Sequence, residues 1–147
     1  FNASQGSIYV ESRVQSFVAT TFPRIVSVDR GDGSANFMAQ VRSNGFSKIE
    51  FSAFAGTGQA VGLQPNVTFS ADSTAKTCFS FAADDFINSA SGILSVADTS
   101  GTVPTSLTVL GIGMQGNAAL QYNGTLRRLT YFPQRLPNST LQAITQL

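Results

Sequence analysis

The residues that could carry out acid–base chemistry are few and lie far apart along the chain. The sequence of 147 residues has eight Asp and Glu and no histidine, which excludes a histidine-dependent catalytic triad and a histidine metal site. The two glutamates, Glu11 and Glu50, are the candidates for a glycosidase pair, because glycoside hydrolysis needs two carboxyl groups across one cleft. They fall on different predicted strands, so glycoside hydrolysis is the least favoured of the functions considered.

The segment from Val28 to Ser34 places Asp29 and Asp32 in a glycine-rich loop. Two carboxylates three residues apart are compatible with oxygen coordination of a metal, although the spacing is far from an EF-hand pattern. Asp32-Gly33 between two predicted strands is first of all a hairpin turn. The Arg30-Gly31-Asp32 tripeptide matches integrin ligands, but so short a match is weak, and the turn is the favoured interpretation.

Aromatic side chains could bind sugar rings, because carbohydrate recognition uses exposed aromatics together with short polar side chains. The chain has no tryptophan, and most of its 12 phenylalanines are expected in the core. Tyr9 and Tyr122 are therefore the candidate carbohydrate-binding residues.

The composition excludes several classes of partner. With 12% charged residues and a net charge of +1, there is no electrostatic case for nucleic acid. No apolar run reaches the roughly 18 residues that a membrane span needs, so no membrane insertion is expected. Cys78 is the single cysteine, which rules out an intrachain disulfide and predicts a small buried apolar residue.

The elements that must position these residues are mostly strands. Apolar residues alternate with a period of two, and turn signals recur about every 8–12 residues, which is typical of an antiparallel sandwich or barrel. Asn44-Gly45 predicts a tight hairpin, and residues 55–62 predict a loop. The expected strands are 7–14, 24–28, 36–42, 48–54, 67–70, 77–82, 86–88, 93–97, 106–112 and 124–132.

The C-terminal segment combines a strand with a short helix. Alternation places Leu126 and Arg128 on one face of the strand and Arg127 on the other, so the two arginines are not expected to form one patch. A helix of about two turns, Thr140 to Gln146, follows with Asn138 or Ser139 as its cap. A helix this short must dock on the sandwich, through Leu141 and Ile144.

The same segment resembles a known family. Its pattern is similar to the C-terminal signature of laminin-G-like (concanavalin A-like) jelly-roll domains of bacteriophage tail fibres, tailspikes and related virion proteins. The matching residues are Asn123, Gly124, Leu126, Arg127, Arg128, Leu129, Tyr131, Phe132, Pro133, Arg135, Leu136 and Leu141.

The resemblance implies an all-β jelly-roll sandwich with a short C-terminal helix, formed by residues 1–147 as one domain of a longer virion protein. It implies a non-catalytic domain that attaches the virion to host-surface glycans. The alternative is a structural role in assembly, oligomerisation or capsid decoration, with other virion chains as partners. The family also suggests homotrimers, and calcium at the rim held by Asp29 and Asp32, with Asp84-Asp85 as a second candidate.

Overall fold

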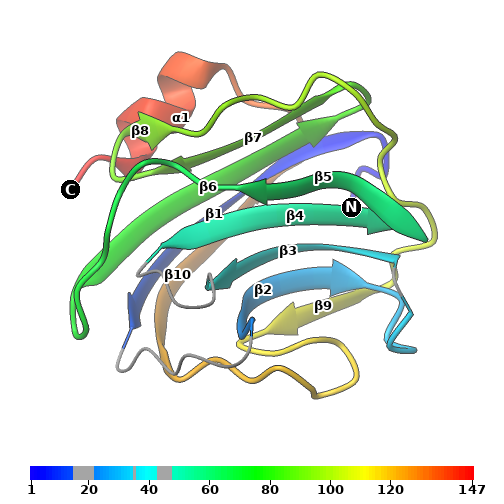
Figure 1. The fold of residues 1–147 in the computed structure, drawn as a ribbon, viewed down its shortest axis with the longest axis horizontal. Coiled ribbons are helices and arrows are strands. Elements are labelled where there is room, and N and C mark those ends of the chain that lie inside the picture. The colour runs from blue at the N-terminus through cyan, green and yellow to red at the C-terminus, as the bar shows by residue number, and fades with distance from the viewer. Residues whose placement is uncertain (15–21, 35, 43–47) are drawn as a thin grey trace.

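Two antiparallel sheets face each other in the computed structural model, which describes residues 1–14, 22–34, 36–42 and 48–147 (Figure 1). Sheet A has the strand order β10-β1-β6-β7-β8, and sheet B has the order β5-β4-β3-β2-β9. The strands of sheet A are β10 (Gly124–Phe132), β1 (Gln5–Val14), β6 (Thr74–Ala82), β7 (Asp85–Ala90) and β8 (Ile93–Leu94). Those of sheet B are β5 (Thr57–Leu63), β4 (Ile49–Ala55), β3 (Asn36–Arg42), β2 (Arg24–Asp29) and β9 (Val109–Ile112). The predicted all-β jelly-roll sandwich is therefore confirmed.

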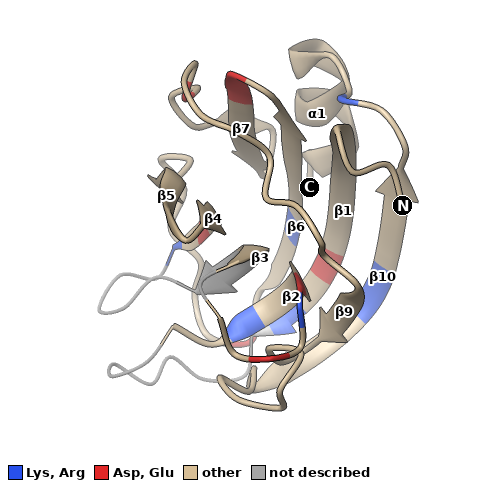
Figure 2. Cartoon of the chain, turned by 90° about the vertical axis from the view of Figure 1, so that its right-hand side faces the viewer, with Lys and Arg blue, Asp and Glu red and all other residues tan. Residues whose placement is uncertain are grey.

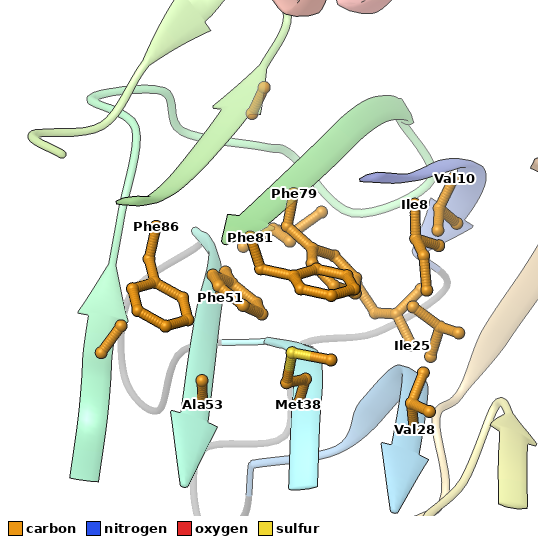
Figure 3. Close-up of a cluster of buried hydrophobic side chains, with 14 of the residues drawn as sticks. Ile8, Val10, Ile25, Val28, Met38, Phe51, Ala53, Phe79, Phe81 and Phe86 are labelled. Carbon is orange, nitrogen blue, oxygen red and sulfur yellow. The ribbon is translucent and has the colours of Figure 1, made fainter. Parts of the chain in front are cut away.

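The core lies between the sheets and is rich in phenylalanine (Figure 3). Phe79 and Phe81 of β6 alternate with residues of the opposite face, as the strand period requires, and both are fully buried. Phe51 of β4 stacks on Phe79 across the gap, with ring centroids 4.4 Å apart. Burying each such side chain contributes roughly 1.5–3 kcal/mol, so these rings hold the two sheets together.

Several strand boundaries differ from the sequence-based expectation. Residues 57–63 form β5, where a loop was predicted, because pairing with β4 satisfies the backbone of this glycine-rich segment. Residues 67–70 form no strand, and the predicted strands 93–97 and 106–112 shorten to β8 and β9. The predicted Asn44-Gly45 hairpin lies outside the described residues.

A β-bulge changes the faces of the last strand. Glu11 of β1 pairs with Arg128 of β10, whereas the next residue, Ser12, pairs with Leu126. Arg127 is thus an extra residue in the ladder. Both arginines are exposed, and Leu126 packs against the core, so the prediction that the arginines point to opposite faces is wrong.

Helix α1 (Asn138–Thr145) lies against the outer face of sheet A, with contacts to β6, β7 and β8. Leu141 is fully buried in a small cluster with Cys78 and Ile87, and Ile144 packs at its margin, as the spacing predicted. The helix is capped by Pro137, whose carbonyl accepts the first helical hydrogen bond from Leu141, so the predicted caps Asn138 and Ser139 are wrong. In the described part of the chain, no helix has the length and apolar character to cross a membrane.

Candidate functional site

The outer face of sheet B carries a row of small residues across four strands. Gly111, Ser27, Ala39 and Ser52 are direct neighbours in the β9-β2-β3-β4 ladder, and all four are buried. Their inward-facing neighbours along the strands, such as Val28 and Met38, belong to the core. The row therefore forms a strip of small residues on the outer face, and residues 114 and 115 cover its end at Gly111 and Ser27.

An aromatic pair lies next to this strip. Phe37 of β3 and Phe54 of β4 are opposite each other in the ladder, and their ring centroids are 4.9 Å apart. Both are partly exposed, and neither belongs to the core cluster. Val61 of the edge strand β5, which is 58% exposed, extends the apolar character of this region. Such a platform can pack against the apolar face of a sugar ring.

Arg24 is the most unusual residue of this face. Arg24 is only 7% exposed, and its guanidinium carbon lies 4.0 Å from the centroid of the Phe37 ring. Burial lowers the pKa of Arg24 to about 10, against the opposing influence of Asp29 and Glu50. Within the described residues its Nε has no hydrogen-bond partner, and no carboxylate forms an ion pair with it. A buried cation without a direct ion-pair partner is costly, which marks this position as one suited to an anionic ligand.

Glu50 supplies a second charged group on the same face. It pairs with Val41, whose other neighbour in the ladder is Arg24, and its own side chain is almost completely buried. The Gln64 amide donates a hydrogen bond to Glu50 Oε2, which fixes the carboxylate. An arginine, a carboxylate and two aromatic rings thus come from β2, β3 and β4 to one surface.

Asp29 anchors the loop of residues 113–116 to this face through hydrogen bonds. Its Oδ2 accepts hydrogen bonds from Ser27 Oγ and from the backbone N–H of Gly116, both at 2.8 Å, and its Oδ1 accepts one from the N–H of Gly31 at 2.7 Å. A Cβ added at Gly116 would overlap Asp29 Oδ1, so only glycine allows this approach. Asp29 therefore holds residues 113–116 against the sheet.

The same contacts bear on the expected calcium site. Both oxygens of Asp29 accept hydrogen bonds from groups of the protein itself, and Asp32 is exposed and paired with Arg30 at 3.4 Å. Asp85 is paired with Arg135 at 2.9 Å, and Asp84 accepts from the N–H of Gly101. Among the described residues no three acidic or cysteine side chains gather in one place, and calcium binding by Asp29 and Asp32 or by Asp84-Asp85 stays a prediction.

The two predicted carbohydrate-binding tyrosines lie on opposite faces of sheet A. Tyr9 is 6% exposed and packs beneath α1, next to Cys78 and Leu141. Tyr122 packs against the core between the sheets, and its hydroxyl donates to Ser12 Oγ at 3.4 Å. They do not form one site, and glycan contact by either stays a prediction.

The two glutamates are separated by the whole sandwich. Glu11 alternates with the core residue Val10, so it lies on the outer face of sheet A, whereas Glu50 lies on the outer face of sheet B. Two carboxyl groups on opposite surfaces cannot act across one cleft.

The sequence analysis missed Arg24, Phe37 and Phe54. The sequence did carry a signal for Phe54. Alternation along the strand places it on the same face as the polar residues Lys48, Glu50 and Ser52, whereas the apolar residues Ile49 and Phe51 lie on the other face. A phenylalanine in phase with polar residues indicates an aromatic on the outer face. Arg24 had no such signal, because its position over Phe37 depends on the pairing of β2 with β3.

No family model matches the sequence, and no curated protein matches it. The fold is similar to that of several solved structures. The CBM40 of the Ruminococcus gnavus IT-sialidase bound to α2,3-sialyllactose is 14% identical, with a TM-score of 0.78 over 98% of this chain and 83% of that one. Domain 4 of AbnA, a GH43 extracellular arabinanase from Geobacillus stearothermophilus, in complex with arabinotriose, is 10% identical, with a TM-score of 0.76 over 97% of this chain and 67% of that one. The leech intramolecular trans-sialidase matches with a TM-score of 0.73 and 15% identity, over 97% of this chain and 23% of the enzyme. At these identities the likeness establishes the fold, a jelly-roll sandwich of the kind found in carbohydrate-binding modules.

Proposed function

We propose that the chain is a non-catalytic carbohydrate-binding domain and that the outer face of sheet B binds an acidic glycan. The observation that carries this proposal is the buried guanidinium of Arg24, stacked on Phe37 without an ion-pair partner among the described residues. The likeness to modules bound to sialyllactose and arabinotriose supports a glycan as the ligand.

Each group on this face has a defined part in the proposed complex. A sugar carboxylate meets Arg24, where a charge-assisted hydrogen bond in a partly dry setting is about twice as strong as a neutral one. The ring of the sugar packs on Phe37 and Phe54. Glu50 accepts a hydrogen bond from a sugar hydroxyl, and its own position is held by Gln64.

The test is a titration of the chain with α2,3-sialyllactose, followed by calorimetry, with lactose as the neutral probe. Arg24→Gln is expected to weaken binding at least tenfold, because it removes a charged hydrogen bond of roughly 1.5–3 kcal/mol. Phe54→Ala is expected to weaken it less. Arg30→Gln is the matched control, since it removes the same charge from an exposed loop.

Equal affinity of Arg24→Gln and the unaltered chain would refute the site. Stronger binding of lactose than of sialyllactose would refute the preference for acidic sugars.

We propose a virion as the setting of this binding, in a tail fibre, tailspike or other surface appendage that attaches to host glycans. The support is the resemblance of residues 123–141 to the signature of those domains. Light scattering tests the accompanying trimer, because a trimer has three times the 15.5 kDa mass of the chain. A trimer with no glycan affinity would instead favour the structural assembly role.

A further inference from the structure

A polar pocket lies on the side of the molecule opposite to the surface around Arg24, on the outer face of sheet A beside the end of α1. Its volume is about 300 Å³. Tyr9, Phe132 and Ile144 form its apolar wall, and Glu11, Lys76 and Arg128 supply its charges. Lys76 lies on β6, Glu11 on β1 and Arg128 on β10, and Figure 2 shows basic or acidic positions on these three strands. The volume is at the lower end of the range for small-ligand sites, which suits a single sugar residue.

Arg128 is held in place by two contacts within the pocket. Its Nε donates to Thr130 Oγ1 at 3.2 Å, and its guanidinium carbon lies 5.7 Å from the centroid of the Tyr9 ring. Neither contact uses its terminal nitrogens, and among the described residues no acid forms an ion pair with it. Arg128 is therefore positioned and still able to accept a bidentate anion.

The pocket has more positive than negative charge. Its one carboxylate, Glu11, is shared with Arg127 at 3.8 Å. The Lys76 ammonium donates to the backbone carbonyl of Gln146 at 2.9 Å, which fixes it near the C-terminal end of the helix. The bulge in β10 is what brings Arg127 and Arg128 to this face together, so that Glu11 is neutralised by one and the other remains for a ligand.

We infer that this pocket is a second binding site, for a carboxylate-bearing sugar residue of an acidic glycan. The carboxylate binds to Arg128 and Lys76, and the ring packs against Phe132 and Tyr9. The class of ligand rests on the proposed function, but the site does not, because it shares no residue with the surface around Arg24.

The experiment is a titration with α2,3-sialyllactose followed by amide NMR shifts, using the unaltered chain, Arg24→Gln, Arg128→Gln and the double variant. In Arg24→Gln, shifts at Thr130 and Phe132 are expected to persist with an unchanged dissociation constant. Adding Arg128→Gln is expected to weaken that remaining binding at least tenfold. Adding Arg13→Gln instead is expected to leave it unchanged, since Arg13 carries the same charge on the same face outside the pocket.

The outcomes separate the two proposals. Loss of all shifts at Thr130 and Phe132 in Arg24→Gln would overturn the second site, as would unchanged shifts in Arg128→Gln. Persistence of all binding in Arg24→Gln, with its complete loss in Arg128→Gln, would overturn the first site and support the second. Lys76→Gln is a second variant, and we expect it to weaken binding at this pocket about threefold or more. It tests the pocket independently of any folding defect that is specific to Arg128→Gln.

Discussion

The buried guanidinium of Arg24 is expected to reduce stability in the absence of a ligand. Removing a buried charge that lacks a partner and keeping its packing often stabilises a protein. Arg24→Met keeps an unbranched side chain over Phe37, and we expect it to raise the free energy of unfolding by about 1 kcal/mol while glycan binding at the outer face of sheet B is lost. Thermal unfolding measures the change. A fall in stability would mean that Arg24 is a structural residue.

The reactivity of the Cys78 thiol reports whether the residues beneath helix α1 are buried. Burial raises the pKa of its thiol to about 12, from an ordinary value of 9.0. Only the thiolate reacts with disulfide reagents, so we expect no labelling of the folded chain at pH 8 and rapid labelling once it is unfolded. The unfolded thiol loses its proton at lower pH than the folded one. This group therefore lowers stability as pH rises from about 9 towards 12. Fast labelling of the native chain would contradict the burial.

At the scale of elements, residues 113–116 depend on glycine for their contact with sheet B. In Gly116→Ala the added methyl group overlaps the carboxylate of Asp29, so the hydrogen bond from the Gly116 N–H must break. We expect the free energy of unfolding to fall by about 1–3 kcal/mol, the usual range when a hydrogen bond to a buried charged group is removed. Urea denaturation measures the loss, and hydrogen exchange should show faster exchange at residues 115 and 116. An unchanged exchange rate would show that the loop is held by other contacts.

The C-terminal helix depends on a buried hydroxyl as well as on Leu141. Thr145 Oγ1 lies 2.8 Å from Ser89 Oγ and accepts from the Gly92 N–H at 3.1 Å. Thr145→Val has nearly the same shape but leaves those groups without a partner, and we expect it to destabilise the chain by about 1–3 kcal/mol. Ser139→Ala, on the exposed side of the same helix, is the control. Equal stability of the two variants would refute this anchoring role.

The sequence predicted the sandwich and most strands because a period of two reports directly on which residues a sheet buries. Phe51, Phe79 and Ile8 are core residues for this reason. The candidate site was not predicted, because Arg24 and Phe37 meet through strand pairing between residues that are 13 positions apart. The faces of Arg127 and Arg128 were predicted wrongly, since an inserted residue breaks the alternation and leaves no mark on composition.

At the scale of the whole molecule, the two proposed sites lie on opposite outer faces of the sandwich. A domain with two such faces can link two glycan chains, although each contact alone is weak. We expect a polymer with many sialic acid residues to form large particles with the unaltered chain, detected by light scattering. Arg24→Gln or Arg128→Gln alone should reduce the particles strongly, because each chain then keeps only one of its two sites. Particles formed equally by a single-site variant would show that linking does not need both faces.

The extra residue in β10 has a consequence for how this domain could diversify. Loss of the single codon for Arg127 would restore a regular ladder, with Arg128 still opposite Glu11 and the apolar residues Leu126 and Leu129 still facing inward. Such a deletion would leave the hydrophobic interior unaltered and subtract one cation from the exterior, freeing the glutamate to neutralise the arginine that remains. One small genetic event could thus lower the positive charge of the second pocket by one and weaken its attraction for anions.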